Sequence, residues 1–315
     1  MSAEARLVVV LGPTGAGKSA LGIWLAERLG GEVVVCDSTQ VYRHFDIGTA
    51  KVRREERRGI PHHLMDLVEP DELFTAGEYR RRALAVLADL RQRGKVPILT
   101  AGTGLYLRAL LEGLADAPLR SEAMRTRLRE KTKRKGDEYL HRLLVRLDPG
   151  AAARIDARDI QKVTRAVEIC ILAGKPVSEV HRAGREPLEG YGVRKIGLLP
   201  PRAELYARIE ERVTIMLQQG WLEEVKQLRA RGIPPTAKPF QFIGYAELQD
   251  HLRGKWDRAG AVRQIQQATR RYAKRQVTWF RKEAGVKWFT GFGDTREVQA
   301  EVLDLLMEGE KAAGS

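Results

Sequence analysis

Short apolar runs alternate with longer amphipathic segments along much of the chain. Residues 7–11 (LVVVL), 32–36 (EVVVC) and 96–100 (VPILT) are apolar and rich in β-branched residues, which is typical of strands buried on both faces of a parallel sheet. Residues 18–29 and 78–93 place their apolar residues at helical spacing. The pattern therefore predicts an α/β fold, a parallel sheet core with helices on both faces.

This alternation stops near Pro118. From 118 to 189 the periodicity is helical and no convincing strand is present, so we expect an all-helical insertion domain between two parts of the core, 1–117 and 190–315. Strand character returns at 194–199 (RKIGLL), and VKWF at 286–289 has the composition of a last strand. Further helices are expected over 202–230, 244–253 and 258–283.

Composition indicates a folded protein with an anionic partner. The chain has 315 residues, 43% of them hydrophobic and 30% charged, and no apolar run approaches the ~18 residues of a membrane span. Its apolar start runs directly into a glycine loop, unlike a signal peptide, so we expect a cytoplasmic protein without a membrane partner. The net charge of +14 favours a polyanionic partner, although a basic surface that binds nothing would have the same balance.

The cysteines and histidines offer no obvious metal site. Cys36 and Cys170 each lie in an apolar segment, and we expect both to be reduced and buried. His62 and His63, close to Asp66, have a poor spacing for metal binding, which favours a structural turn.

Residues 12–19 (GPTGAGKS) match the phosphate-loop pattern G-x-x-x-x-G-K-[ST] between a predicted strand and a predicted helix. The glycines let backbone N–H groups converge on an anion at the start of the helix, where Lys18 adds a positive charge and the Ser19 hydroxyl can hold Mg²⁺. ATP, GTP and a prenyl diphosphate would all fit such a loop. The predicted phosphate-binding residues are Gly12, Pro13, Thr14, Gly15, Ala16, Gly17, Lys18 and Ser19.

Asp37 directly follows the second predicted strand. Ligands of open α/β sheets bind beyond the carboxyl ends of the strands, so Asp37 is expected to face the same crevice as Lys18. Spacing alone leaves three roles open: holding magnesium through water, acting as a general base beside an acceptor amine, or capping a helix or turn.

Eight motifs, in order, resemble those of one known family. They are GPTGAGKS, DSTQVY (37–42) with DIGTAK (46–51), HHLMD (62–66), GTGLY (102–106), QKVTRA (161–166), RIEERVTIML (208–217) with GW, IGYAEL (243–248) and KRQVTWFR (274–281). Together they resemble the tRNA dimethylallyltransferases, also called isopentenyl-diphosphate:tRNA transferases. The resemblance extends from residue 7 to about 290. Eukaryotic relatives carry a C-terminal zinc finger that this sequence could not form, so the resemblance is to the bacterial type.

The resemblance implies a phosphate-loop core with a helical insertion and one reaction. The dimethylallyl group of dimethylallyl diphosphate is transferred to N6 of the adenosine on the 3′ side of the tRNA anticodon, and diphosphate is released. By motif position, Asp37 is similar to the family's general base, Thr103 lies near the diphosphate and the acceptor, and Arg212 reaches the leaving group. Lys18 completes the implied catalytic set, with Mg²⁺ as the cofactor.

The same resemblance implies which residues contact the anticodon stem-loop of tRNA. No protein partner is implied, and with no long heptad run we expect a monomer. The implied tRNA-binding residues are Asp37, Ser38, Thr39, Gln40, Thr103, Arg125, Gln161, Lys162, Val163, Thr164, Arg165, Gln241, Phe242, Ile243, Gly244, Tyr245 and Ala246.

Aromatic and basic residues extend this hypothesis. Phe240, Phe242 and Tyr245 could stack on displaced bases or pack in the core with equal plausibility, whereas Trp279 and Phe280 are expected to be core residues. Two basic segments, 125–135 and 270–282, are expected to form positive stripes that contact RNA.

Two other functions share the phosphate loop. A P-loop kinase of a nucleoside or other small molecule would use ATP, and the insertion could then be mistaken for its lid. A non-catalytic RNA-binding ATPase or switch protein would leave DSTQVY and GTGLY without a role.

Overall fold

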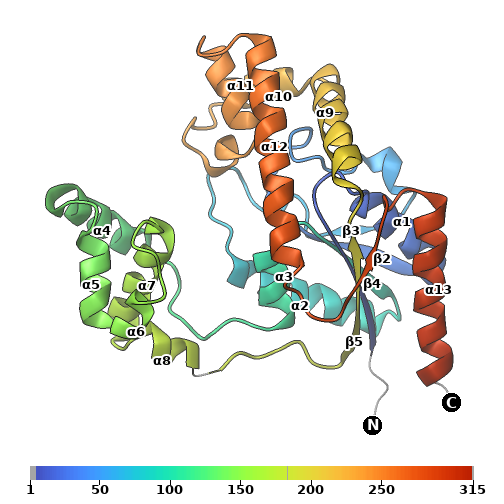
Figure 1. The fold of residues 1–315 in the computed structure, drawn as a ribbon, viewed down its shortest axis with the longest axis horizontal. Helices are drawn as coiled ribbons and strands as arrows, with labels where there is room; N and C mark the ends of the chain where they lie inside the picture. Colours follow the sequence, from blue (N-terminus) through green and yellow to red (C-terminus); the bar gives the residue numbers. More distant parts are fainter. Residues whose placement is uncertain (1–4, 183, 314–315) are drawn as a thin grey trace. The chain divides into compact units, whose positions relative to one another are not determined.

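A six-stranded parallel sheet is the centre of the computed structural model, which describes residues 5–182 and 184–313 (Figure 1). The strands lie in the order β3-β2-β4-β1-β5-β6, and all neighbouring strands are parallel. In register, Leu11 of β1 and Cys36 of β2 both pair with Ala101 of β4, so these three strands end level with one another. The strands are β1 (Ala5–Leu11), β2 (Gly31–Cys36), β3 (His62–His63), β4 (Val96–Ala101), β5 (Tyr191–Leu198) and β6 (Val286–Phe289).

Helices cover both faces of the sheet, as predicted. On one face α1 (Lys18–Leu29) and α13 (Arg296–Ala313) pack on alternate strand residues such as Val8 and Val10. On the other face α2 (Ala76–Gln92) lies against β2 and β4, and its Tyr79 stacks on Tyr106 of α3 (Gly104–Leu111) with ring centroids 4.6 Å apart. The fold class predicted from the apolar runs is confirmed.

A second layer of helices builds on the carboxyl edge of this core. It contains α9 (Arg202–Gln218), α10 (Trp221–Ala230), the 3₁₀ turn η2 (Lys238–Gln241), α11 (Tyr245–Leu252) and α12 (Arg258–Phe280). The helical region expected at 202–230 is two helices, because Gly220 adopts φ 98° between them. Phe45, Trp221, Phe240 and Tyr245 form the aromatic core of this layer.

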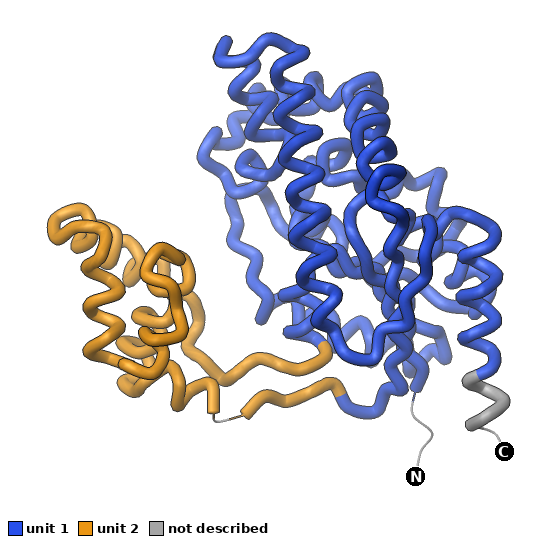
Figure 2. The backbone as a smooth tube through the Cα atoms, in the orientation of Figure 1, with its two compact units in different colours: residues 1–110, 189–315 blue, residues 111–188 orange. Residues whose placement is uncertain are grey.

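The chain divides into two compact units, coloured separately in Figure 2. One consists of Met1–Leu110 with Glu189–Ser315, and the other of Leu111–Leu188, whereas the pattern had placed the insertion at 118–189. The second unit has its own apolar core, which includes Leu128, Leu144 and Val167. Its helices are α4 (Glu122–Lys135), α5 (Tyr139–Leu147), α6 (Pro149–Ala152), α7 (Ile160–Ala173) and α8 (Val177–Arg182).

Two elements differ from the sequence pattern. His62 and His63 form β3, the edge strand beside β2, where a turn was expected. The helix α13 was not predicted, and it is held against α1 by Val298, Val302 and Leu306 at intervals of four residues. Both elements depend on contacts with distant parts of the chain.

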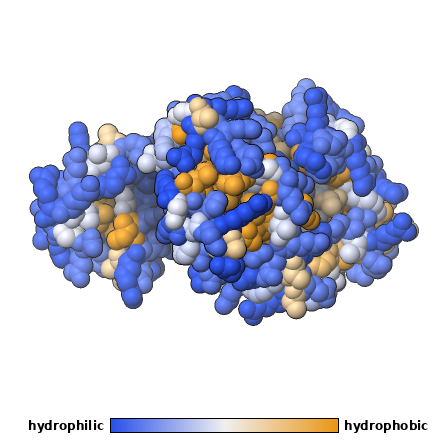
Figure 3. Space-filling model, turned by 90° about the horizontal axis from the view of Figure 1, so that it is seen from above, coloured by the Kyte–Doolittle hydropathy of each residue, from blue (hydrophilic) through white to orange (hydrophobic). Residues whose placement is uncertain are grey.

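The prediction of two reduced, buried cysteines agrees with the structure. Cys36 and Cys170 are free and buried, and the described residues contain no cluster of three or more metal-ligating side chains. Within the described ranges, no helix has the length and apolar character to cross a membrane. The face drawn in Figure 3 is mostly hydrophilic, with hydrophobic residues gathered in separate patches.

Candidate active site at the carboxyl edge of the sheet

The phosphate loop connects β1 to α1 and is braced by two other strand ends. Gly12 has φ 148°, and a side chain there would place its Cβ 2.7 Å from the carbonyl oxygen of Leu198 on β5. Gly17 has φ 85°, and its Cβ would lie 2.7 Å from the backbone nitrogen of Gly293. The Gly293 N–H donates to the Ala16 carbonyl at 2.9 Å. Glycine is therefore required at both positions, and the turn after β6 holds the loop in place.

Three of the predicted catalytic residues share one electrostatic environment. Burial lowers the pKa of Lys18 to about 8, the nearby Asp37 carboxylate opposes this shift and Arg212 adds to it. Burial and Arg208 lower the pKa of Arg212, while Asp37 opposes them. Lys18, from the first turn of α1, donates to the Pro13 carbonyl at 2.8 Å. The site thus holds two cations and one carboxylate, all three partly buried, so that solvent screens them less than it would on an exposed surface.

Arg208 and Arg212, which lie one turn apart on α9, differ in their partners. Arg208 forms a bidentate ion pair with Asp294, and its guanidinium lies 4.5 Å from the centre of the Phe292 ring. In the described parts of the chain, Arg212 has no ion-pair or hydrogen-bond partner. Its charge is therefore available to an anion bound at the site.

Asp37 and Thr103 belong to one small polar network. Asp37 Oδ1 accepts hydrogen bonds from the Thr39 N–H (2.8 Å) and the Thr39 hydroxyl (2.7 Å). The Thr103 hydroxyl accepts from the Ser38 N–H at 2.9 Å and lies 3.2 Å from the Ser38 hydroxyl. Gly102 makes room for Oδ2, because a Cβ at position 102 would lie 2.5 Å from that atom. Oδ1 is thus held by Thr39, while Oδ2 faces the backbone of Gly102.

Gln40, the fourth residue of this motif, points elsewhere. Its side-chain amide donates to the carbonyls of Thr49 and Ala50, at 3.1 and 3.3 Å. Lys51 stabilises the same segment, with its ammonium bound to the Tyr42 carbonyl, Asp46 and Asp66. The segment from Asp37 to Lys51 is therefore held in shape by its own side chains.

Sequence patterns did not single out Gln276 and Tyr272, two residues of α12 near this network. Gln276 is only 6% exposed and bonds to both the phosphate loop and Gly102. Burial raises the pKa of Tyr272, and the Asp37 carboxylate adds to the increase. One feature of the sequence could have indicated Gln276. It is a polar residue at helical spacing from the apolar Ala273 and Phe280, and a buried polar side chain needs hydrogen-bond partners.

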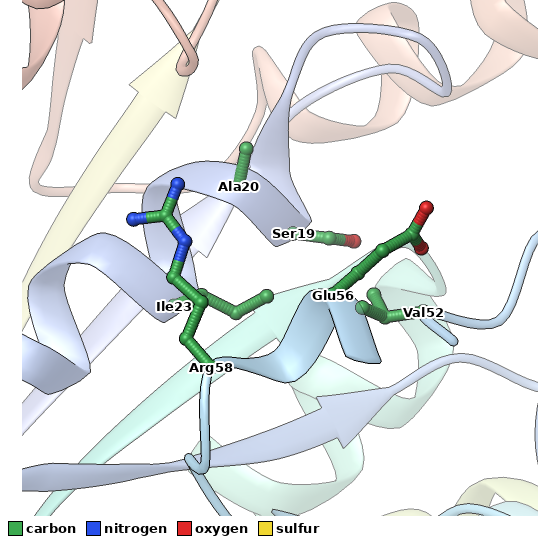
Figure 4. Close-up of a pocket in the computed structure, with 6 residues that line it drawn as sticks. All are labelled: Ser19, Ala20, Ile23, Val52, Glu56 and Arg58. Carbon is green, nitrogen blue, oxygen red and sulfur yellow. The ribbon is translucent and has the colours of Figure 1, made fainter. Parts of the chain in front are cut away.

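Ser19, the last residue of the phosphate loop, lines a cavity of about 250 Å³ (Figure 4). Within the described ranges its hydroxyl has no hydrogen-bond partner, so it is free to bind a cation. None of Asp37, Thr103 and Arg212 lines this cavity. The lining residues are Ser19, Ala20, Ile23, Val52, Glu56 and Arg58.

The predicted tRNA contacts of the helical unit divide into exposed and structural residues. Gln161 and Lys162 are exposed on the first turn of α7, and Thr164 is half-buried. Val163 is fully buried in the unit's core, so its side chain cannot contact RNA. The prediction for this segment therefore rests on Gln161, Lys162 and Thr164, with Val163 serving as a core residue.

Arg125 and Arg165 both bind a buried carboxylate. Glu168 is fully buried and accepts hydrogen bonds from Arg125 (3.0 and 3.2 Å) and from Arg165 (2.7 Å). Arg165 also donates to the Pro118 carbonyl at 2.8 Å. Their guanidinium groups hold the unit together, which argues against their being free phosphate ligands.

The second predicted tRNA segment, 241–246, also contains both exposed and buried residues. Gln241 is exposed, and Phe242, Ile243 and Ala246 are half-buried. Gly244 is buried because the Trp221 ring covers it, 1.9 Å from where a Cβ would lie. Tyr245 is fully buried, and its hydroxyl donates to Glu224 at 2.5 Å and accepts from the Gly48 N–H. Tyr245 and Phe240 (1% exposed) are therefore core residues and cannot stack on a base, whereas Phe242 keeps some exposed surface and packs on Tyr42.

Trp279 corrects another expectation. Phe280 is fully buried, as predicted, but Trp279 is 37% exposed. Its indole lies over Gly104, where a Cβ would be 2.0 Å from Nε1, and the Arg108 guanidinium is 4.9 Å from the ring centre. An exposed indole therefore borders the GTG loop.

Of the two basic segments, the one on α12 forms a clear stripe. Arg271, Lys274 and Arg275 are exposed at helical spacing, opposite the buried Ala273, Gln276 and Phe280. The segment 125–135 lies on α4, whose single buried residue is Leu128. The α12 stripe therefore belongs to the same helix that contacts the catalytic loops.

Known proteins resemble the chain along nearly its full length. The family model "IPP transferase" matches residues 40–283. The tRNA dimethylallyltransferases of Solibacter usitatus and Koribacter versatilis are each 50% identical to it, over 298 and 300 residues, which is 95% of this chain and 97% of each relative.

Solved structures agree with these relatives. The tRNA isopentenylpyrophosphate transferase from Bacillus halodurans matches 99% of this chain and all of its own, with 37% identity and a TM-score of 0.71. A eukaryotic dimethylallyltransferase acting on tRNA matches 98% of this chain and 80% of its own, with 28% identity and a TM-score of 0.82. The resemblance found in the motifs is confirmed, and the chain belongs to the IPP transferase family, the family of the tRNA dimethylallyltransferases.

Proposed function

We propose that this enzyme transfers the dimethylallyl group of dimethylallyl diphosphate to N6 of the adenosine 3′-adjacent to the anticodon of tRNA. The arrangement that supports this most strongly is the carboxyl edge of the sheet. There the phosphate loop lies near Asp37, whose Oδ2 is not bound by Thr39, and near Arg212, which has no ion-pair partner among the described residues. A kinase that phosphorylates a small molecule has no exocyclic amine to deprotonate. It would therefore not need a carboxylate and a hydroxyl such as those of Asp37 and Thr103 beside the phosphate loop.

The transfer breaks the bond between C1 of the prenyl group and the diphosphate oxygen and forms a bond between C1 and N6. Negative charge grows on the departing diphosphate, where the loop N–H groups, Lys18 and Arg212 would stabilise it. These groups are partly buried, and each interaction there is stronger than in water.

Asp37 would take the proton that N6 must lose. The N6 lone pair is conjugated with the ring, so the amine becomes a useful nucleophile only as its proton leaves. Thr39 occupies Oδ1, and we assign Oδ2 as the proton acceptor. Thr103, held by Ser38, would orient the acceptor or a diphosphate oxygen through its hydroxyl. The product is N6-dimethylallyladenosine, with free diphosphate and one proton on Asp37.

The target adenine is stacked in its loop and must leave the stack to reach Asp37. Single-stranded RNA permits this for a few kcal/mol. Trp279, exposed beside Gly104, and the basic stripe of α12 would receive the loop. The exposed Gln161 and Lys162 are proposed as further tRNA contacts.

Mg²⁺ is proposed as the cofactor. The free hydroxyl of Ser19 and the oxygens of a bound diphosphate are the hard ligands that this ion prefers, so these residues fit it. Bound there, Mg²⁺ would neutralise charge on the diphosphate. We further propose that the enzyme acts as a cytoplasmic monomer.

Labelled substrates test the function directly. The purified protein is incubated with bulk tRNA, Mg²⁺ and either dimethylallyl diphosphate labelled in the prenyl group or ATP labelled in the γ-phosphate. We expect the prenyl label to become covalently attached to the tRNA and the phosphate label to be transferred to nothing. Transfer of the phosphate label to a small molecule would support the kinase instead.

A further inference from the structure

The buried side chain of Gln276 connects the phosphate loop to the GTG loop, which follows β4. Gln276 Oε1 accepts a hydrogen bond from the Thr14 N–H at 2.8 Å. Its Nε2 donates to the Gly102 carbonyl at 2.8 Å. Thr14 belongs to the loop that would hold the diphosphate, and Gly102 lies against Asp37 Oδ2 and precedes Thr103. The two ends of one amide therefore reach the two halves of the site.

The surroundings of Gln276 make this bridge rigid. The side chain is 6% exposed, and its neighbours on the buried face of α12, Ala273 and Phe280, are 1% and 0% exposed. A buried amide requires its hydrogen bonds, since an unmade one costs about 1–3 kcal/mol. The amide oxygen accepts from one loop and the amide nitrogen donates to the other, so only one orientation of the amide makes both bonds. No apolar residue of the same size could make both bonds.

The distance between the two loops matters to the reaction. In-line displacement at C1 needs the diphosphate and the acceptor nitrogen held on opposite sides of one carbon, and misplacement of about 1 Å costs about 10²-fold in rate. The phosphate loop and the GTG loop start from neighbouring strands, β1 and β4, but β1 and β4 pair only up to Leu11 and Ala101. Beyond those residues the two loops are not paired in the sheet, and the Gln276 side chain bonds to both of them.

We propose that Gln276 is a positioning residue, which sets the distance between the bound prenyl diphosphate and the general base by bonding to Thr14 and Gly102 together. This rests on the proposed function of the site. Gln276 touches neither substrate in this role. It acts through the backbone of the two loops that do.

The position of Gln276 also connects the site to RNA. It lies on α12, one turn from Tyr272 and close to the exposed stripe residues Lys274 and Arg275. If tRNA bound the exposed face of α12, the buried face of the same helix would hold Gln276 against the phosphate loop and the GTG loop. The bridge therefore contributes more to the rate of transfer than to the affinity for either substrate.

Three variants test the bridge. Gln276→Met has a similar shape and makes neither bond. Gln276→Glu can accept from Thr14 but can donate to Gly102 only when its carboxyl is protonated. Gln249→Met is the matched control, because Gln249 is also buried (4% exposed) and donates to a backbone carbonyl, that of Phe240, at 3.1 Å.

The measurements are kcat and KM for dimethylallyl diphosphate, the Kd for tRNA, the thermal midpoint and the pH dependence of kcat. For Gln276→Met we expect kcat to fall about 10–100-fold, with KM and Kd changed less than about threefold. For Gln276→Glu, the ratio of its kcat to that of the unsubstituted enzyme should rise as the pH is lowered, since the neutral acid restores both bonds. Gln276→Met should show no such rise, and Gln249→Met should lower only the thermal midpoint.

The proposal is overturned by a kcat of Gln276→Met within twofold of the unsubstituted enzyme, or by an equal loss of kcat in Gln249→Met. It is also overturned if the Gln276→Glu ratio does not change with pH, a comparison that holds even if Gln276→Met fails to fold. Failure of the proposed function itself would look different, because the unsubstituted enzyme would then transfer no prenyl group at all.

Discussion

Asp37 is held so that only one of its oxygens is bound within its own motif. Thr39 binds Oδ1 through two hydrogen bonds, and Gly102 leaves room for Oδ2. The spacing of the sequence left three roles open for this residue. Oδ1 fills the turn role, since it accepts the Thr39 N–H. We favour the general base for Oδ2, because Asp37 interacts with Lys18 and Arg212, the two cations proposed to hold the diphosphate.

Replacing Asp37 should separate chemistry from binding. A positioned base contributes ~10²–10⁴-fold, so we expect Asp37→Asn to lower kcat by that factor. The affinity for dimethylallyl diphosphate should change little, because that ligand is held by the phosphate loop. Single-turnover transfer and equilibrium binding measure the two effects. Asp71→Asn, which removes an exposed carboxylate, is the control, and normal turnover of Asp37→Asn would exclude the base role.

Lys18 should make the use of diphosphate dependent on pH. Burial lowers its pKa to about 8, and only the protonated ammonium attracts the anion. We therefore expect kcat/KM for dimethylallyl diphosphate to be constant below that pH and to fall as the pH rises through about 8. In the complex the bound anion favours the charged form, so kcat should fall only at higher pH. In Lys18→Arg the decline should vanish, and a kcat/KM that stays level up to about pH 9.5 in the unsubstituted enzyme would contradict the idea.

At the scale of elements, α12 has two faces with different tasks. Its buried face carries Gln276, which bonds to both catalytic loops, and its exposed face carries Arg271, Lys274 and Arg275. In the stripe predicted on α4, Arg125 is already bound to Glu168 and is not available to a phosphate. The stripe of α12 is therefore the better candidate for contact with RNA phosphates.

Neutralising part of this stripe should weaken tRNA binding in a salt-dependent way. A cation that neutralises one RNA phosphate adds about one to the slope of log Kd against log salt. For Arg271→Gln with Lys274→Gln we expect the slope to fall by about two and affinity at low salt to drop. Arg28→Gln with Lys95→Gln removes the same charge near the amino ends of the strands and should leave the slope unchanged. Equal slopes in all three proteins would mean that the stripe only solubilises the helix.

At the scale of the molecule, the chain contains two compact units with separate cores. The helical unit is organised around Glu168, which is fully buried and bound by Arg125, Arg165 and the Ser121 N–H. Burial alone would raise the pKa of Glu168, but these hydrogen bonds outweigh it and lower the pKa. The ionised form is therefore the one that stabilises this unit.

Removing this charge should destabilise the helical unit at neutral pH. Breaking a buried ion pair costs ~3–5 kcal/mol, and we expect Glu168→Gln to lie near the lower end because both arginines keep some exposure. Since the folded-state pKa is lowered, the stabilisation is present at neutral pH and is lost as the pH falls through that pKa, so the two proteins should converge in acid. Denaturation followed by hydrogen exchange over 111–188 measures the difference. Glu138→Gln, at an exposed pair with Arg142, should change stability by no more than about 0.5 kcal/mol, and an equal effect at both sites would refute this role of Glu168.

Local sequence was sufficient for features that depend on neighbours in the chain. The apolar runs at β1, β2 and β4 predicted buried parallel strands, because a strand covered on both faces needs no polar positions. The glycines and Lys18 predicted the phosphate loop, since the pattern that specifies its turns spans only eight residues. The ends of β5 and β6 then brace the loop in the folded chain. Asp37 could be placed at the same edge because parallel strands end together.

Tertiary contacts decided the rest. Tyr245 and Val163 occur in motifs similar to those that contact RNA, yet packing from distant helices buries both side chains. His62 and His63 form a strand only because β2 offers them an unpaired edge, and α13 depends on the apolar surface of α1. Gln276 acquires its role by bonding to residues 262 and 174 positions away, a distance over which no sequence pattern carries information. A short-range pattern specifies the conformation of a segment, but burial and pairing are set by which segments meet, and that is determined only when the whole chain has folded.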